Sequence, residues 1–276
     1  MNTKAILYLV PTPIGNLQDM TFRAIQTLKD VTLILAEDTR TSGFLLKHYE
    51  IRTPMQSYHK HNERKRCSEI IERLKKGDSI ALISDAGTPV ISDPGELLVK
   101  EVIANDFEVI CLPGATAFVP ALVASGLCPS KFSFHGFLPE KLKDKTAIME
   151  NIKENSETLI FYISPHNISS ELEFFLNHLG NRKAVLAKEI SKFHETFYRG
   201  TLESLMKDDT MNRKGEFVLI IEGFVQKQAN SLDAEQMLIK LLSEGLSGKD
   251  AVTETVSALK LRKNIVYDIY TKLKKA

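Results

Sequence analysis

Short, mainly apolar runs recur in the first 125 residues, and longer amphipathic segments separate them. These runs are Ile6–Val10, Val31–Ala36, Ile80–Ile83 and Phe107–Leu112. Continuous apolar runs of this kind are typical of strands buried on both faces of a parallel sheet. Strands that alternate with helices predict an α/β domain with a mainly parallel sheet.

Apolar residues at helical spacing predict the helices between these strands. Asp19 or Thr21 is expected to cap a helix that buries Phe22, Ile25 and Leu28. A later helix face consists of Cys67, Ile70, Ile71 and Leu74. The turn that ends at Gly95 is expected to start another helix near Glu96.

The pattern becomes less regular after Gly126. Strands are predicted at Phe132–Phe137, Thr158–Ile163 and Ala184–Ile190, and short adjacent strands over Ala184–Gly200 favour antiparallel pairing. The last part of the chain predicts three small helices. We therefore expect an N-terminal α/β domain (1–125), a second α/β domain with a mixed sheet (126–226) and a C-terminal helical region (227–276).

Three loops follow the carboxyl ends of predicted strands and are rich in small residues. They are Pro11–Leu17, Ser84–Pro89 and Pro113–Ala117. Open α/β sheets bind ligands at this edge, and small residues let a ligand approach the backbone. We expect the loops to converge on one crevice, although each could be an ordinary connection.

Composition narrows the class of protein. The 276 residues are 43% hydrophobic and 26% charged, as in globular proteins, and the net charge of +1 gives no global attraction to nucleic acid. Three cysteines without paired spacing suggest reduced thiols and a cytoplasmic location. No Walker-type phosphate loop, dinucleotide fingerprint or metal-binding motif occurs, so we expect neither a nucleoside triphosphatase nor a metal site.

Two polar regions are candidates for function. Glu37–Arg40 follows the second strand and is either a solvated turn with an internal ion pair or part of a site. Ser57–Arg66 and the segment Lys260–Lys275 carry basic residues that could contact RNA; a solvated face or a packed helical appendage is the alternative. Small backbone-lined loops with an acidic residue are compatible with S-adenosylmethionine, which combines an amino acid with a nucleoside.

Several motifs resemble those of the tetrapyrrole methylase superfamily and, within it, of the ribosomal RNA small subunit methyltransferase I family. They are Val10–Leu17, Ala36–Arg40, Ser84–Gly95, Pro113–Ala115, Gly136–Pro139, Ser164–His166, Lys188–Lys192, Gly215–Phe217 and Gly248–Ala251. The resemblance follows nearly the whole chain in order. Glu140 and Asn167 depart from it, because basic residues are expected there; this affects RNA contact rather than the cofactor loops.

The resemblance implies a homodimer with S-adenosylmethionine between two α/β domains. It also implies methyl transfer to the ribose 2′-oxygen of a cytidine in the decoding region of 16S rRNA, on the small ribosomal subunit. We expect cofactor binding at Pro13, Asp85, Ala86, Gly87, Thr88, Ile91, Ala115, Thr116, Ile163 and Ala187. The predicted RNA-binding residues are His59, Lys60, Arg64, Lys65, Lys260, Arg262 and Lys263.

The catalytic candidates are Asp38 with Arg40 and Lys188 with Glu189. A 2′-hydroxyl needs in-line placement and a proton acceptor, which a charged pair at a strand end can supply. Two other functions stay open at this point. One is methylation of a tetrapyrrole or another small molecule, which would not need the basic C-terminal part. The other is a non-catalytic ribosome-binding protein, which would not bind S-adenosylmethionine.

Overall fold

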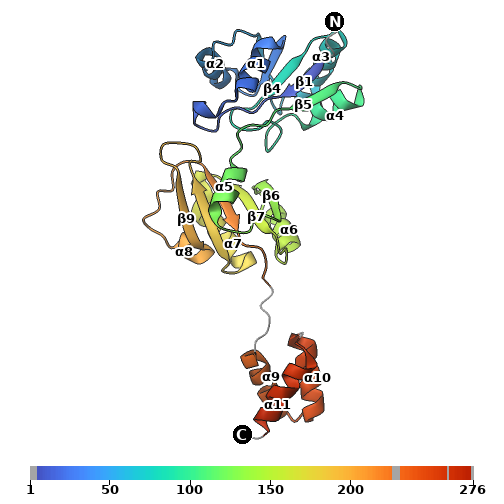
Figure 1. The fold of residues 1–276 in the computed structure, drawn as a ribbon, viewed down its shortest axis with the longest axis vertical. Coiled ribbons are helices and arrows are strands. Elements are labelled where there is room, and N and C mark those ends of the chain that lie inside the picture. The colour runs from blue at the N-terminus through green and yellow to red at the C-terminus, as the bar shows by residue number, and fades with distance from the viewer. Residues whose placement is uncertain (1–4, 226–230, 260, 275–276) are drawn as a thin grey trace. The chain divides into compact units, whose positions relative to one another are not determined.

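The first half of the molecule is built on a parallel sheet, as the apolar runs predict. The computed structural model describes residues 5–225, 231–259 and 261–274. In this part the first sheet has the strand order β3-β2-β4-β1-β5, and every pairing is parallel (Figure 1). Its strands are β1 (Ile6–Leu9), β2 (Leu33–Ala36), β3 (Met55–Ser57), β4 (Ile80–Ile83) and β5 (Glu108–Cys111).

Two pairs of helices cover the two faces of this sheet. The helices are α1 (Phe22–Asp30), α2 (Thr39–His48), α3 (Glu63–Lys75) and α4 (Glu96–Ala104). Alternate residues of each strand point to opposite faces, so Leu35 packs with α3 and α4 while Ile34 packs with α1 and α2. Thr21 caps α1 through its side chain, as predicted. The prediction that Phe22 is buried is wrong: Ala24 and Leu28 form the buried face, and Phe22 is 93% exposed.

The second sheet is mixed, as predicted from the sequence. Its strand order is β6-β7-β10-β8-β9, with β6 and β7 parallel and the other pairs antiparallel. The strands are β6 (Phe132–Phe137), β7 (Thr158–Ile163), β8 (Lys183–Lys188), β9 (Thr196–Thr201) and β10 (Phe217–Ile221). The helices are α5 (Phe118–Ser125), α6 (Leu142–Ile152), α7 (Ile168–Leu179) and α8 (Leu202–Met206).

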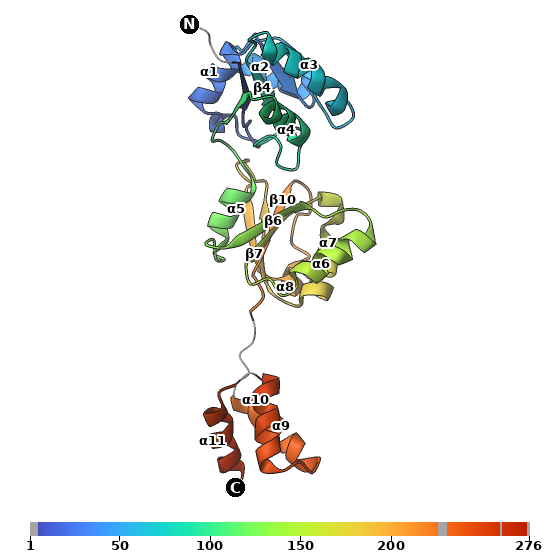
Figure 2. The same cartoon turned by 90° about the vertical axis from the view of Figure 1, so that its right-hand side faces the viewer.

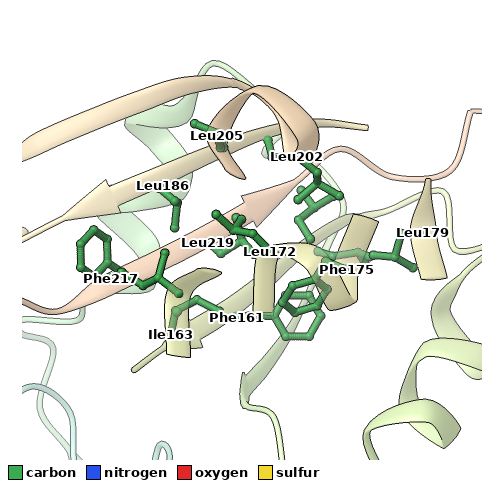
Figure 3. Packing of buried hydrophobic residues seen from close by; sticks show 14 of the residues in the cluster. Phe161, Ile163, Leu172, Phe175, Leu179, Leu186, Leu202, Leu205, Phe217 and Leu219 are labelled. Atoms are coloured by element: carbon green, nitrogen blue, oxygen red, sulfur yellow. The ribbon is translucent and has the colours of Figure 1, made fainter. Parts of the chain in front are cut away.

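Each face of the second sheet has its own apolar layer. Helix α5 lies on one face, and α6, α7 and α8 lie on the other (Figure 2). Figure 3 shows the larger layer, where Phe161 and Leu219 of the sheet meet Leu172 and Phe175 of α7. The rings of Phe161 and Phe175 lie 4.6 Å apart and both side chains are fully buried. Aromatic pairs of this kind add to the stabilisation from burial.

A separate compact unit begins at Val225. It contains α9 (Ser231–Ser243), α10 (Gly248–Leu259) and α11 (Lys263–Leu273), as three helices were predicted. Leu238, Ala251, Val252 and Val266 form its core. The predicted boundary at Gln226 lies outside the described residues. In the described part of the chain, no helix is long and apolar enough to span a bilayer.

Candidate cofactor cavity and its rim

The three small-residue loops touch one another because they follow adjacent strands. Strand β1 lies between β4 and β5, so their carboxyl ends share one edge. The backbones of Thr12 and Gly87 exchange two hydrogen bonds of 2.9 Å. The Thr88 hydroxyl donates to the Ala115 carbonyl at 3.0 Å, which joins the second loop to the third. A Cβ at Gly114 would lie 2.6 Å from Pro11 Cβ, so this glycine permits the close approach.

A cavity of about 480 Å³ opens at these loops. This volume lies within the range of small-molecule sites. The segments that follow the strands of the first sheet contribute Ile14, Glu37, Asp85–Thr88, Ile91–Asp93, Thr116 and Ala117 to the lining, and Phe118, which begins α5, also lines the cavity. The second sheet contributes Phe137, Tyr162–Pro165, Ile190 and Glu216–Val218. The two sheets of the first compact unit therefore both form the walls.

Most of the predicted cofactor residues meet in this cavity. Those in the lining are Asp85, Ala86, Gly87, Thr88, Ile91, Thr116 and Ile163. Ala115 stands behind Thr88, and Pro13 lines a neighbouring hollow with Asp85. Ala187 of β8 is fully buried in the apolar layer that the second sheet forms with α5. Their roles in binding stay predictions.

The lining carries four carboxylates and, among the described residues, no lysine, arginine or histidine side chain. The four are Glu37, Asp85, Asp93 and Glu216. Burial, then the charges of Glu37 and Asp85, raises the pKa of Asp93 to about 6, while a hydrogen bond with Ser84 opposes the shift. Burial and Asp85 also raise the pKa of Glu37. A positively charged ligand would relieve this repulsion, because an opposite charge favours the ionised form of a carboxyl group.

Sequence reasoning did not select Glu37, Asp93, Tyr162 or Glu216 as site residues. Asp93 lies in the turn Ser92–Gly95, which closely follows the Ser84–Pro89 loop. Two polar turns so close together were the available sequence signal for Asp93. Glu37 directly follows β2, next to the predicted Asp38. Tyr162 and Glu216 enter the lining through the second sheet, and the spacing along the chain does not reveal that packing.

Asp38 and Arg40 lie next to the cavity and bond to each other. Asp38 is the N-cap of α2: its carboxylate accepts from the Arg40 backbone N–H at 2.8 Å and from the Arg40 guanidinium at 2.7 Å. These hydrogen bonds lower the pKa of Asp38 to about 2. The Asp38 backbone N–H donates to the Asp85 carboxylate at 3.2 Å, so this turn holds a lining residue in place. Neither Asp38 nor Arg40 belongs to the lining.

Lys188 and Glu189 occupy the end of β8. Lys188 is 5% exposed, and its ammonium lies 6.0 Å from the ring centre of Phe217, which lines the cavity. Glu189 accepts from the Glu216 backbone N–H at 2.8 Å and pairs with Lys192 at 3.0 Å. Burial opposes ionisation of Glu189, but these hydrogen bonds prevail and lower its pKa. Both residues stand behind the lining, and their catalytic assignment stays a prediction.

The first group of predicted RNA-binding residues gathers beside the cavity. The Tyr58 backbone N–H bonds to the Ala36 carbonyl at 2.8 Å, which brings the following loop next to Glu37. His59 is half-buried, and Lys60, Arg64 and Lys65 are exposed. Arg262 and Lys263 are exposed at the start of α11 in the separate helical unit. Lys260 lies outside the described residues.

Comparison with known proteins decides the family. The chain is 43% identical over 275 residues to "Ribosomal RNA small subunit methyltransferase I" of Bacillus subtilis, with 96% of this chain and 94% of that protein covered. A protein with the same name from Haemophilus influenzae is 45% identical over 268 residues, with 95% of each chain covered. The family model of tetrapyrrole (corrin/porphyrin) methylases matches residues 6–206. The chain belongs to the tetrapyrrole methylase family, in the group of ribosomal RNA small subunit methyltransferase I.

Solved structures of tetrapyrrole methylase folds agree with the architecture. A crystal structure of diphthine synthase aligns with a TM-score of 0.63 at 13% identity and covers 80% of this chain and 92% of its own. A uroporphyrin-III-C-methyltransferase from Thermus thermophilus aligns with a TM-score of 0.56 at 16% identity, covering 79% and 94%. At these identities the likeness supports the fold, and the resemblance noted in the sequence is confirmed by the relatives of higher identity.

Proposed function

We propose that this protein transfers a methyl group from S-adenosylmethionine to the ribose 2′-oxygen of a cytidine in the decoding region of 16S rRNA. The observation that carries the proposal is the similarity over nearly the full length to proteins named for methylation of small-subunit rRNA. That similarity includes the C-terminal unit, beyond the residues that the general methylase model matches.

The cavity supports S-adenosylmethionine as the methyl donor. Its volume and its apolar residues suit a nucleoside, and the excess of carboxylates suits a molecule with a sulfonium and an ammonium group. Within the Ser84–Thr88 loop, Asp85 and Ala86 are exposed and line the cavity, and Ala86 and Gly87 have no bulky side chain. We assign the predicted cofactor residues to this binding.

When bound, S-adenosylmethionine supplies an electrophilic methyl group on a positively charged sulfur. The 2′-oxygen forms a bond to the methyl carbon, the carbon–sulfur bond breaks with its electron pair on sulfur, and the hydroxyl proton passes to a base. The protein must place the oxygen in line and accept the proton.

We assign Asp38 and Arg40 to orientation of the ribose or of a flanking phosphate. The low pKa of Asp38 makes it a weak base. Its ion pair holds the Asp38 carboxylate and the Arg40 guanidinium in a fixed position next to the cavity, and the Arg40 side chain, which is 87% exposed, can also bind an anion. Lys188 with Glu189 is the second pair to test. The basic residues of the 59–65 segment, together with Lys260, Arg262 and Lys263, are proposed to hold RNA phosphates.

We further propose that the protein works in the cytoplasm as a homodimer on the small ribosomal subunit. Sedimentation equilibrium of the purified protein should give twice the chain mass of 31.0 kDa. A monomer at micromolar concentration would reject the dimer without affecting the assignment of the reaction.

Mapping of 2′-O-methylation on 16S rRNA tests the proposal directly. Cells that lack the protein should lose one ribose methylation in the decoding region, and the gene supplied in trans should restore it. An unchanged methylation map, with an altered pattern of methylated tetrapyrroles instead, would favour a small-molecule substrate.

A further inference from the structure

The turn Ile91–Gly95 forms one wall of the cavity and has an unusual backbone. Ile91, Ser92 and Asp93 belong to the lining. Val90 has φ 76°, Ser92 has φ 67° and Gly95 has φ 133°. A branched residue such as Val90 rarely adopts a positive φ, and conformations of this kind persist only when surrounding contacts hold them.

Glu63 supplies such a contact. One oxygen of its carboxylate, Oε1, accepts from the Gly95 backbone N–H at 3.1 Å and from the Tyr58 hydroxyl at 3.0 Å. Tyr58 is fully buried. Gly95, whose N–H is the first donor, is the N-cap of α4. A Cβ at Gly95 would lie 2.7 Å from the Leu82 side chain, so Leu82 also restricts the position of the turn.

The same glutamate lines a hollow on the outer surface. Its walls include Lys60, Arg64 and Lys100 together with Glu63 and Glu96, and we call it the basic hollow. Lys60 and Arg64 are proposed RNA-binding residues, and Glu63 begins the helix that carries Arg64. Glu63 therefore belongs to the 59–65 segment and also bonds to the turn that forms a wall of the cofactor cavity.

We infer that Glu63 is a positioning residue that fixes the Ile91–Gly95 turn for cofactor binding and ties this turn to the RNA-binding segment. The inference rests on the proposed function for the identity of the ligand. Its physical basis is the shared acceptor: without Oε1, the Gly95 N–H loses its partner and the turn can relax away from its positive-φ conformation. The cavity wall would then lose the arrangement that contacts the ligand.

Calorimetric titration with S-adenosylmethionine tests the inference in the full-length protein. Glu63→Ala should weaken binding by about 10-fold or more, because the acceptor is removed. Glu63→Gln should stay within about 3-fold of the wild type, because its amide oxygen can accept the same two bonds. Glu69→Ala is the matched control: Glu69 lies on the same helix, is paired with Arg66 at 2.9 Å and does not line the cavity.

Amide hydrogen exchange distinguishes a local loosening of the turn from a loss of overall stability. In Glu63→Ala, the amide of Gly95 and its neighbours in the turn should exchange faster, while the amides of β1 and β4 keep their protection. In Glu63→Ala the buried Tyr58 hydroxyl has no acceptor, which could unfold the variant. The double variant Tyr58→Phe/Glu63→Ala removes that hydroxyl and would then be used instead, with the same expected loss of affinity.

The outcomes separate this inference from the proposed function. Wild-type protein that does not bind S-adenosylmethionine would reject the proposed cofactor. Wild-type binding with equal affinity in Glu63→Ala, or equal weakening in Glu63→Gln and Glu63→Ala, would overturn the positioning role of the Glu63 oxygen.

Discussion

At the scale of single residues, the cavity concentrates negative charge where a cation is proposed to bind. Asp93 shows the consequence most clearly, because its pKa is raised to about 6 by burial, by Glu37 and by Asp85. In the protein without ligand, the native state binds more protons than the unfolded chain between the ordinary pKa of 3.8 and about 6. The contribution of Asp93 to stability is therefore greatest at low pH and declines as the pH rises through about 6.

Ligand binding should follow the opposite trend. A positively charged S-adenosylmethionine prefers ionised Asp93, so its affinity should fall by up to about 10-fold as the pH is lowered from 7 to 5. Titrations at several pH values in wild type and Asp93→Asn check this prediction. The variant should bind more weakly at pH 7 and show a flatter profile; a profile parallel to that of the wild type would assign the titration to another group.

Asp38 offers a second test at this scale. Asp38→Asn keeps a good N-cap for α2 but removes the charge of the pair with Arg40. We expect a loss of about 10²-fold in the single-turnover rate, because the ribose or a flanking phosphate would no longer be held in line for transfer. Affinity for S-adenosylmethionine and the melting temperature should stay near those of the wild type.

Asp30→Asn is the control for Asp38→Asn, since Asp30 bonds to Gln26 on α1 and lies outside the lining. Wild-type turnover in Asp38→Asn at saturating cofactor would remove Asp38 from the reaction. Lys188 with Glu189 would then be the pair to examine.

At the scale of elements, the loops depend on backbone conformations that few residues adopt. Gly87 has φ 82°, and its Cβ would lie 3.3 Å from Ile14 in the cavity lining. Gly87→Val should therefore abolish detectable S-adenosylmethionine binding. Gly126→Val is a matched control, because Gly126 also has φ 82° but has no atom near its Cβ position.

Both glycine variants should be destabilised by about 1–3 kcal/mol, the usual cost of a strained backbone conformation. Only Gly87→Val should lose binding by calorimetry. If both variants bind the cofactor as the wild type does, the cavity at this loop is not the cofactor site.

The buried strands were predicted well because a short, continuous apolar run favours a buried strand whatever the rest of the fold is. Strand β7 was predicted with its observed bounds, and β4 follows Ile80–Ile83. The edge strand β3 (Met55–Ser57) was missed, because all three residues are half-exposed and carry no apolar run. Phe22 was assigned to a core face from spacing alone, but its side chain is exposed, and Ala24 and Leu28 form the buried face of α1.

The site was predicted in part for a similar reason. The loops at strand ends could be found along the chain, since small residues and turns are local signals. Glu216 and Tyr162 could not, because they reach the cavity only through the packing of the second sheet. An internal ion pair was one of two alternatives that the sequence left open for Glu37–Arg40, and the structure shows it between Asp38 and Arg40 at 2.7 Å.

At the scale of the whole molecule, the basic residues are divided between two compact units. We expect Lys260→Ala/Arg262→Ala/Lys263→Ala to weaken binding to the small ribosomal subunit and to reduce the slope of log affinity against log salt by about one for each phosphate that is no longer neutralised. Filter binding at several salt concentrations measures this slope. Lys75→Ala/Lys207→Ala is the control, because each lysine pairs with a glutamate of its own helix. An unchanged slope in the triple variant would assign the three residues to solubility.

The place of β1 between β4 and β5 has a consequence for the order of folding. Ile6 of β1 pairs with Glu108 of β5, about 100 residues later in the chain. At a synthesis rate of about 5–20 residues per second, β1 is therefore made several seconds before β5, its second neighbour in the sheet. Helices α9, α10 and α11 contact one another within a short stretch of chain and need no such wait. Because local contacts form faster than distant ones, pulse-labelling during refolding from denaturant should find the amides of α9–α11 protected before those of β1. Protection of β1 before the three helices would contradict this order.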